Sequence, residues 1–485
     1  MDNGLVFSSE LPPATIADRV RRGELTRIAT GVYSTEIGRS VEEVVRAHLF
    51  DIAGRLLPGA VITDRSARTG APVAGVLYLA RPGRPRDIDL PGLLVRARAG
   101  AGPQPDDISL PGGLYLASRP RGLAENARPS RARAGGRRTL DQSELGDWVD
   151  YICTTDGPEL LAEYRRLAVG LAPTLGVGDE HIHRLERLIG IALGTRANEP
   201  TTSAALAARR SGRPVDQARV RRFEDLAAAL RGAAPQSHPL DPAASGRNTY
   251  EPFFEAYFSN FIEGTEFEVD EARQIVFDGV VPSGRPEDAH DVLGTYRLVA
   301  DADEMSQTGT DPDEFIALVK RRNARIMEGR PGQRPGQFKE LANRAGATSF
   351  VEPALVEGTL AAGFRLRDEL DTAWEKALYV AFVVAEVHPF ADGNGRTARV
   401  MMNAELHAGG QSRIIIPTVF RQDYLDGLRL LSRRDDPSVF IKAMRYAHDF
   451  TASIDFSTFT EAKAHLQTAH AFDEPDSAQR LRIRV

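Results

Sequence analysis

The sequence predicts a multidomain, mainly α-helical protein with a small α+β region at its N-terminus. Apolar residues recur at helical spacing through most of the chain beyond residue 144, whereas short strand-like runs separated by Gly and Pro occupy the stretch up to about residue 120. A chain of 485 residues also suggests two to four domains, at roughly 100–200 residues per domain. The domains that we expect span residues 1–45, 46–150, 151–235 and 236–455, with a flexible tail at 456–485.

The bulk composition is that of an ordinary globular protein, with 42% hydrophobic and 26% charged residues. No apolar run approaches the roughly 20 residues of a membrane-spanning helix, and the first residues lack the basic and apolar regions of a secretion signal. We therefore expect a soluble, cytoplasmic protein without a membrane partner. The single cysteine, Cys153, excludes an internal disulfide framework and a multi-cysteine metal site, and we expect it to be a buried small residue.

Residues 1–45 predict a short helix followed by a small hairpin. An apolar helical face over 12–23 ends at a glycine, and β-like segments follow over 25–33. This order is similar to the helix and wing of winged helix-turn-helix modules, whose helix enters a DNA groove. Such modules have a full helix before the recognition helix, and "NGLVFSSEL" leaves little room for one.

The N-terminal part of the chain is basic and the rest is acidic. Residues 1–140 contain 21 Arg, no Lys and 14 acidic residues, a net charge of +7, so the remainder carries −13. A basic region on an acidic protein suggests contact with nucleic acid. The alternative is a general preference for arginine over lysine, because no lysine precedes Lys320.

Residues 46–150 predict a small α+β unit, with a helix over 40–57 and strand-like pieces such as "GVLYLAR" and "GLLVRAR". The pieces "VRRGELTRIATGVYS", "LLPGAVITDRSA", "LPGGLYLASRPRGLAEN" and "RTLDQSELGDWVD" resemble, in order and spacing, the AbiEi-type antitoxin and transcriptional-regulator family. That resemblance implies DNA as a partner of this region. The arginine-rich stretch 125–139 is interpreted either as a solvated linker or as an arm that contacts phosphates.

Residues 144–232 predict helices throughout, and "GAAPQSHPLDPAASGRN" then predicts a plain linker into the next domain. Beyond it, residues 368–388 predict a buried helix that ends at a histidine. Apolar residues such as Trp374 and Leu378 recur there at steps of three or four up to His388, and Pro389 cannot continue the helix. We therefore expect His388 at the end of a rigid core helix.

The loop "FADGNG" that follows predicts an anion site. Gly393 and Gly395 permit a tight turn in which backbone N–H groups converge, at the start of a helix whose dipole favours an anion. Arg396 and Arg399 lie three residues apart on that helix and add two cationic donors. Asp392 is a candidate ligand for a Mg²⁺ ion that bridges phosphates. A polar turn beside a buried histidine is the alternative, but the glycines and arginines together favour the anion site.

The segment "HPFADGNGRTAR" resembles the signature of Fic-domain (Fic/Doc, Fido) proteins at every defined position, within a resemblance that covers residues 240–455. It implies an all-α domain with a short β-hairpin flap, which transfers AMP from ATP to a Ser, Thr or Tyr hydroxyl of a target protein. By this resemblance His388 is the general base, Phe390 anchors the loop and Asp392 binds Mg²⁺. The residues that it assigns to ATP and its phosphates are Gly393, Asn394, Gly395, Arg396 and Arg399. The related Doc kinases carry a lysine at the position of Gly395 and transfer phosphate instead.

An aromatic helix over 250–264 carries a second motif. Glu263 falls in its last turn, where the helix dipole disfavours a carboxylate and an arginine partner would relieve the cost. "SNFIEG" resembles the inhibitory motif of the Fic family, here Ser259 and Glu263. By that resemblance Glu263 pairs with Arg399 and prevents the γ-phosphate of ATP from docking productively. The alternative is a solvated glutamate at a helix end.

Two further segments are assigned by the same resemblance. "ATSFVEPALV", residues 347–356, stands where the family has the flap that aligns its target by strand pairing, with Phe350 and Val351 as the contacts. Glu352 stands where proline is usual. Ser432, in "YLDGLRLLSRRDD", occupies the place of an asparagine that contacts the nucleotide.

The sequence thus predicts a protein adenylyltransferase, a nucleotidyltransferase that uses ATP and Mg²⁺ and is autoinhibited by Glu263. De-AMPylation by the same site is one alternative. The other is a DNA-binding regulator or antitoxin in which the Fic domain is secondary or regulatory. The expected partner is a target protein with a reactive hydroxyl, and DNA and a second copy of the chain are further candidates.

Overall fold

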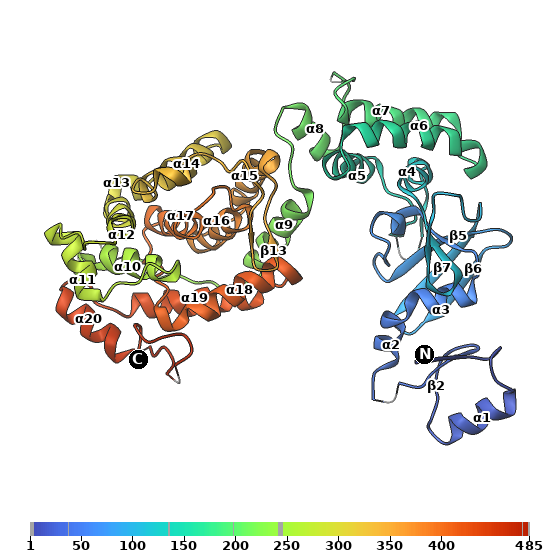
Figure 1. Cartoon of the computed structure of the whole chain (residues 1–485), viewed down its shortest axis with the longest axis horizontal. Coiled ribbons are helices and arrows are strands. Elements are labelled where there is room, and N and C mark those ends of the chain that lie inside the picture. The colour runs from blue at the N-terminus through green and yellow to red at the C-terminus, as the bar shows by residue number, and fades with distance from the viewer. Residues whose placement is uncertain are drawn as a thin grey trace. The chain divides into compact units, whose positions relative to one another are not determined.

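The computed structural model describes residues 4–36, 38–133, 136–196, 198–240, 246–477 and 479–483. The chain divides into two compact units, Met1–Gly212 and Arg213–Val485 (Figure 1). The first unit combines strands with helices, and the second is mainly helical, as the sequence predicts.

The first unit begins with a small sheet and one helix. Its elements are β1 (Leu5–Phe7), α1 (Pro13–Arg21), β2 (Thr26–Ala29) and β3 (Val32–Ser34), and the antiparallel strand order is β1-β3-β2. The predicted helix and hairpin are confirmed. Within residues 4–36, however, α1 is the only helix, and the next helix begins at Val41, after the hairpin, so a helix-turn-helix over residues 1–45 stays a prediction. Leu5–Phe7 is a short apolar run that pairs with β3 instead of forming a first helix.

A six-stranded mixed sheet forms the centre of this unit, in the order β6-β7-β5-β4-β9-β8. Its strands are β4 (Val61–Ile62), β5 (Val76–Arg81), β6 (Arg86–Leu90), β7 (Leu93–Ala99), β8 (Ile108–Leu110) and β9 (Leu114–Leu116). The helices around it are α2 (Val41–Ala47), α3 (Leu49–Leu56) and α4 (Arg119–Ala127). The predicted strands correspond to β4, β5, β7 and β9. Strand β6 was not predicted, because "RDIDL" is mostly polar and exposed.

The first unit ends in helices, as predicted. These are α5 (Gln142–Thr155), α6 (Pro158–Leu175), α7 (Asp179–Ala192) and α8 (Ala204–Arg210). Cys153 is buried in α5, as expected. The arginine-rich stretch contains a two-residue hairpin, β10 (Ala132–Arg133) with β11 (Gly136–Arg137), and its residues 134 and 135 lie outside the described part of the chain.

The second unit is built around α16 and α17, which lie side by side at its centre (Figure 1). Its helices are α9 (Gln217–Arg231), α10 (Glu251–Ile262), α11 (Val269–Arg273), α12 (Pro286–Val299), α13 (Ala302–Met305), α14 (Pro312–Ile326), α15 (Val356–Arg367), α16 (Ala373–Val387), α17 (Asn394–Ala408), α18 (Arg421–Arg434), α19 (Ser438–Ala452) and α20 (Phe459–Thr468). One hairpin, β12 (Arg344–Ala345) with β13 (Thr348–Ser349), interrupts them. Helix α9 packs in this unit, although the sequence assigns residues 217–231 to a connector.

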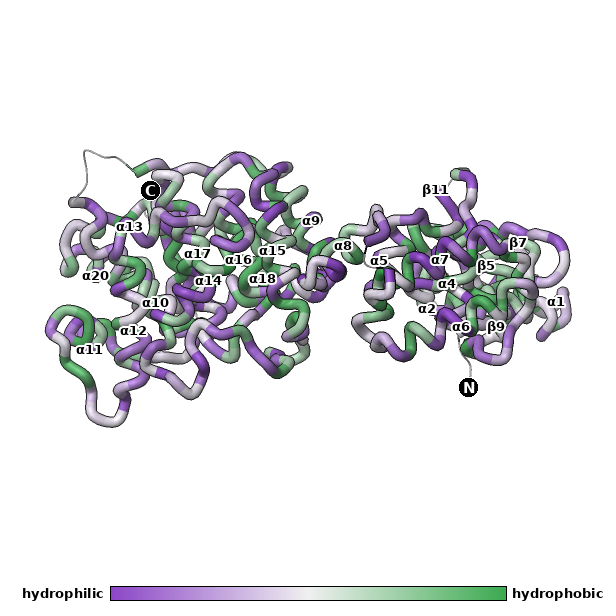
Figure 2. Tube along the Cα trace, turned by 90° about the horizontal axis from the view of Figure 1, so that it is seen from above, coloured by the Kyte–Doolittle hydropathy of each residue, from purple (hydrophilic) through white to green (hydrophobic). Residues whose placement is uncertain are grey.

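Helix α16 is set in position by its cap and by burial on nearly every side. Thr372 and Glu375 form a capping box, in which the Thr372 hydroxyl accepts from Glu375 N–H and the Glu375 carboxylate accepts from Thr372 N–H. Apolar side chains from Trp374 to Val387 are then buried in the main core. Figure 2 shows hydrophobic segments around α15 and α16. A helix fixed this firmly gives the residue that follows it a defined position.

Two sequence expectations for the second unit are corrected. Residues 456–485 were predicted to be a flexible tail, but they contain α20, whose Ala462 and Leu466 are buried beside α10 in a second, aromatic cluster. The predicted plain linker is docked in part: His238 N–H donates to Gln411 Oε1 and Ser412 N–H donates to His238 O. Both segments gain apolar or backbone partners that local periodicity does not reveal.

Candidate active site

His388 is held at the C-terminal end of α16 in a left-handed backbone conformation. Its φ is 51°, which is uncommon for a residue other than glycine, and Pro389 stops the helix. The backbone N–H of His388 still donates to Val384 O at 3.0 Å, which closes the last turn. The histidine therefore marks the end of the core helix, as predicted.

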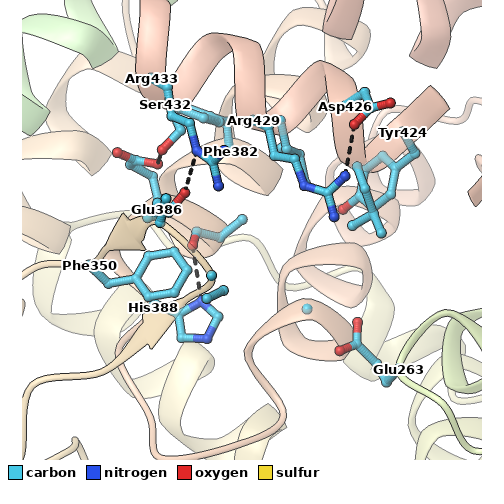
Figure 3. Close-up of a pocket in the computed structure, with 18 of the residues that line it drawn as sticks. Glu263, Phe350, Phe382, Glu386, His388, Tyr424, Asp426, Arg429, Ser432 and Arg433 are labelled. Carbon is cyan, nitrogen blue, oxygen red and sulfur yellow. Dashed lines mark hydrogen bonds and ion pairs between the residues drawn. The ribbon is translucent and has the colours of Figure 1, made fainter. Parts of the chain in front are cut away.

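The imidazole of His388 is fixed by two contacts (Figure 3). Nδ1 lies 3.2 Å from Ala385 O, and because a carbonyl oxygen only accepts, Nδ1 carries the proton and Nε2 keeps its lone pair. The ring stacks on Phe350, with centroids 3.8 Å apart and an interplanar angle of 5°. Burial lowers the pKa of His388 to about 4, so the ring is neutral at pH 7. A neutral, oriented imidazole is suited to accept a proton.

Asn394 braces the loop after His388 from within. Phe390 N–H donates to Asn394 Oδ1, and Asn394 Nδ2 donates to Phe390 O, each at 2.9 Å. Both side chains are buried. The Asn394 side chain is therefore used by the backbone of the loop, so its predicted part in binding phosphate rests on its backbone N–H at the start of α17. Phe390 is buried in the core, where the sequence places it as the anchor of the loop.

The first turn of α17 offers backbone N–H groups to an anion. Gly393 has a φ of 77°, and a Cβ there would lie 2.6 Å from Met327 Sδ. The helix begins at Asn394, so its first N–H groups have no partner in the preceding turn. These groups and the helix dipole together favour a negative charge at this point.

Asp392 is the exposed acidic residue of the loop. Its side chain is 45% exposed, and Oδ1 accepts a hydrogen bond of 2.6 Å from Gly393 N–H. Within the described ranges, no three His, Cys, Asp or Glu side chains are grouped to hold a metal ion. A single accessible carboxylate nevertheless fits Mg²⁺, which binds through one or two carboxylates and completes its shell with water and substrate phosphates.

Arg399 is held by two residues of the segment that carries α10. Its Nε donates to Ser259 Oγ at 2.9 Å, and its Nη2 donates to Ser259 O and to Glu263 Oε1, each at 2.7 Å. Burial acts to raise the pKa of Glu263, but the charge and hydrogen bond of Arg399 lower it below its usual 4.5. The carboxylate is therefore ionised at neutral pH. The structure brings Ser259, Glu263 and Arg399 together in the pairing that the resemblance implies.

The Glu263 carboxylate also lies directly over Gly395. A Cβ on Gly395 would lie 2.1 Å from Glu263 Oε1 and 3.1 Å from Arg399 Nη1. Any side chain at position 395 would therefore collide with this ion pair. The carboxylate occupies the space beside the first turn of α17 that an anion bound there would need.

Arg396 is directed into the protein, and its predicted contact with ATP phosphates is corrected. Its Nη1 lies 2.6 Å from Asp291 Oδ2 in α12, and the same oxygen lies 2.8 Å from Arg330 Nε. Arg396 is only 3% exposed, and Asp291 is fully buried. A buried carboxylate requires a cationic partner, and Arg396 supplies it.

A cavity of about 790 Å³ opens beside His388. This volume lies within the range of small-molecule sites. The cavity is lined by Glu263, Ala345, Gly346, Ala347, Thr348, Phe350, Phe382, Ala385, Glu386, His388, Gly395, Arg399, Tyr424, Leu425, Asp426, Leu428, Arg429, Ser432 and Arg433. The predicted site residues Glu263, His388, Gly395, Arg399 and Ser432 therefore share one cavity.

The hairpin β12–β13 stands where the flap is predicted, and its residues divide between the cavity and the core. Phe350 lines the cavity and packs on His388 (Figure 3). Val351 is fully buried in the main core, so the prediction that it contacts a target is corrected. The reason is the alternation of extended backbone, which turns neighbouring side chains to opposite faces.

Ser432 lies in the cavity and is bound to a carboxylate. Its hydroxyl donates to Glu386 Oε2 at 2.6 Å, and Glu386 is almost fully buried in α16 (Figure 3). Burial raises the pKa of Glu386 above its usual 4.5. Ser432 thus lines the cavity, its hydroxyl is engaged by Glu386, which sequence reasoning missed, and its contact with a nucleotide stays a prediction.

Two other residues of the site were missed. Tyr424 is buried in α18 and hydrogen-bonds Arg399. Lys339 donates to Asn343 Oδ1 at 2.6 Å, and Asn343 Nδ2 donates to Phe390 O at 3.0 Å, so this segment supports the loop that follows His388. Tyr424 opens the segment "YLDGLRLLSRRDD" that the resemblance already covers, which was the available signal for it, and none was apparent for Lys339.

Comparisons with known proteins find a match over this part of the chain. Residues 314–406 match the model of the Fic/DOC family. The chain is 28% identical over 246 residues to "Protein adenylyltransferase Fic" of Culex quinquefasciatus, covering 49% of this chain and 48% of that protein. It is 26% identical over 245 residues to "Protein adenylyltransferase fic-1" of Caenorhabditis briggsae, with the same shares. The chain spans about half the length of the curated relatives it matches.

Among solved structures, a Fic-1 chain from C. elegans superposes with a TM-score of 0.38 and 17% identity, covering 68% of this chain and 90% of that one. Of the helices that the structure describes, none has the length and apolar character to span a membrane. The family match includes α16, the loop after it and nearly all of α17, which are the elements that position His388 and Arg399. This chain therefore carries a Fic/DOC domain.

Proposed function

We propose that the chain is an autoinhibited protein adenylyltransferase, which transfers AMP from ATP to a hydroxyl of a target protein and releases pyrophosphate. The observation that carries the proposal is the placement of His388. Its imidazole is neutral and oriented, and it shares a cavity with Gly395, at the start of α17, and with Arg399. The similarity to proteins named protein adenylyltransferases supports the same activity.

The chemistry follows from the residues of the cavity. His388 Nε2 accepts the proton of the target hydroxyl while the hydroxyl oxygen bonds to the α-phosphorus of ATP. The bond from that phosphorus to the bridging oxygen breaks, and pyrophosphate leaves. The first N–H groups of α17 and the guanidinium of Arg399 stabilise the phosphate charge, so the protein contributes mainly position and electrostatics.

Asp392 is the residue that would hold Mg²⁺. When bound, the ion neutralises charge on the phosphates of ATP. Asp392 is accessible; its Oδ1 accepts from the neighbouring Gly393 N–H and lies 3.8 Å from Arg396 Nη2.

Glu263 inhibits the reaction in this proposal by occupying Arg399. The ion pair withdraws the guanidinium from phosphate binding, and the carboxylate repels an anion from the place beside Gly395. Both effects act on the nucleotide rather than on His388. Inhibition is therefore expected to change how ATP binds while the general base stays intact.

Isotope position provides the test of the reaction class. The Glu263→Gly protein is incubated with Mg²⁺ and ATP labelled at the α-phosphate, and in parallel with ATP labelled at the γ-phosphate. We expect label on protein only from the α-position. Label from the γ-position would indicate phosphate transfer. The absence of label from both positions would overturn the proposal. Loss of α-label as free AMP after the labelled ATP is removed would reveal de-AMPylation by the same site.

A second candidate function, DNA binding by the first unit, is favoured by the net charge of +7 over residues 1–140. In α1, however, Arg21 and Arg22 both pair with Asp18, and Arg19 pairs with Glu24, which reduces the charge offered to phosphates. A gel shift of the full chain on its own promoter tests this candidate. Binding that weakens steeply with salt would support it, and no shift at low salt would remove it.

A further inference from the structure

Helix α9 precedes the residues that match the Fic/DOC model, yet it is anchored firmly beside the site. Asp216 caps it and also donates its backbone N–H to Thr359 Oγ1 in α15 at 2.9 Å. Phe223 packs edge-on against Tyr379 and Phe382 of α16, with centroid distances of 6.4 and 6.2 Å. The helix is therefore a rigid support against α15 and α16.

Two arginines of α9 reach the same buried carboxylate. Arg219 Nε lies 2.9 Å and Arg222 Nη1 lies 2.5 Å from Glu386 Oε1. The arginines are three residues apart and share a helix face. Arg222 also pairs with Asp435, at 2.7 Å. Neither arginine lines the cavity, so both act on the site through other residues.

Of these two arginines, Arg219 is the one that contacts the flap, where Arg433 of α18 also donates to Thr348 Oγ1 at 2.8 Å. Its Nη2 donates to the backbone carbonyl of Ser349, the last residue of β13. Phe350 N–H donates to Asn343 O, and the next pair along the hairpin is Arg344 with Ser349. Because hydrogen-bonded and non-hydrogen-bonded pairs alternate in an antiparallel ladder, the backbone N–H and C=O groups of Arg344 and Ser349 point away from the partner strand. Arg219 thus takes the outward acceptor of β13.

This contact lies next to the residue that touches the candidate general base. Phe350 follows Ser349 directly and stacks on the His388 ring. Val351, one residue further, is buried in the core. The chain is thus held on both sides of Phe350, by Arg219 before it and by the core after it. The other arm of the hairpin is tied through Asn343 to Phe390 O.

We propose that Arg219 is a positioning residue of this enzyme: by holding the Ser349 carbonyl against the Glu386 anchor, it fixes the flap and Phe350 over His388 and so aligns the target hydroxyl. The inference rests on the proposed function, because a flap that aligns a target matters only if a target is modified. Arg219 touches neither nucleotide nor reacting atoms. Its effect is on the acceptor side of the reaction, separate from the control that Glu263 exerts on the nucleotide side.

The test compares Arg219→Gln with Arg222→Gln, both in the full chain with Glu263→Gly. Arg222→Gln is the matched control, since it removes a cation from the same helix face and the same carboxylate but leaves the flap contact intact. Three quantities are measured. These are the rate of auto-modification with α-labelled ATP, the Kd of ATP with Mg²⁺, and mass-spectrometric hydrogen exchange of a peptide covering residues 343–350.

We expect Arg219→Gln to slow auto-modification about tenfold and to speed exchange of the flap peptide, since a charge-assisted hydrogen bond is lost. The Kd of ATP is expected to change less than about twofold, because Arg219 does not line the cavity. Arg222→Gln should leave flap exchange unchanged. Equal slowing in both variants, or unchanged flap exchange in Arg219→Gln, would overturn the proposal. If the Glu263→Gly parent takes up no label, the proposed function fails, and flap exchange alone still decides whether Arg219 holds the flap.

Discussion

The Glu263 carboxylate lies 2.7 Å from the guanidinium of Arg399, although 136 residues separate the two in the chain. The same carboxylate lies so close to Gly395 that no side chain fits between them. One residue therefore both neutralises a cation of the cavity and fills the space at the start of α17. These two effects of Glu263, pairing and occlusion, are separable by substitution.

Glu263→Gln separates them. Glutamine keeps the volume over Gly395 and an acceptor for Arg399 but removes the negative charge. We expect auto-modification to rise above that of the native protein yet to stay several-fold below that of Glu263→Gly, because the side chain still occludes the anion site. The rates of label incorporation at saturating ATP provide the comparison. Equal rates in the two variants would show that occlusion contributes nothing.

The pH dependence of transfer should report the low pKa of His388. A general base works in its neutral form, and burial lowers the pKa of this imidazole from 6.5 to about 4. The rate of Glu263→Gly is therefore expected to stay level as the pH falls from 8 to about 5 and to decline only near 4. Circular dichroism at each pH checks that the protein is folded. A decline centred at 6.5 or higher would contradict the assignment.

Replacing Asp291 by Asn should destabilise the protein. Arg396 and Arg330 would lose a shared, fully buried counter-charge, and breaking such a pair costs about 3 kcal/mol. Urea unfolding of the full chain measures the change. The control is Glu287→Gln, which removes a 63%-exposed partner of the same Arg330 and should cost less than about 0.5 kcal/mol. Similar losses in both variants would show that Arg396 does not depend on Asp291.

The free edge of the flap should be the one that pairs with a target. Arg219 occupies the outward carbonyl of β13, which leaves the outward groups of Arg344 on β12. Arg344→Pro removes the outward N–H of β12 without touching a hydrogen bond inside the hairpin, and should slow auto-modification about tenfold. Ser349→Pro makes the same change on the β13 edge and should slow it less. The opposite order would place the target on β13.

The sequence located the loop of the site well, because its signals are local. His388, Gly393 and Asp392 fall within six residues, and a helix end followed by proline and glycines has only a few backbone solutions. The pairing of Glu263 with Arg399 came from the resemblance, since nothing in the spacing of two residues so far apart indicates contact.

The errors concern side chains whose partners lie on distant segments. Arg396 was expected to bind phosphate, but it pairs with the buried Asp291 of α12. No sequence motif in α12 indicates that pairing. Val351 was placed on the wrong face because the register of the flap against the core is a tertiary property. The contact of Arg219 with Ser349 joins residues 130 positions apart and was likewise invisible.

The most direct test of the account is His388-dependent labelling released by Glu263→Gly. The native protein, Glu263→Gly, and Glu263→Gly with His388→Ala are incubated with Mg²⁺ and α-labelled ATP, and protein-bound label is followed over time. The account predicts little label on the native protein, an increase of about tenfold or more in Glu263→Gly, and a return to background when His388 is also replaced. Equal labelling of the native protein and Glu263→Gly, or label that persists without His388, would contradict it.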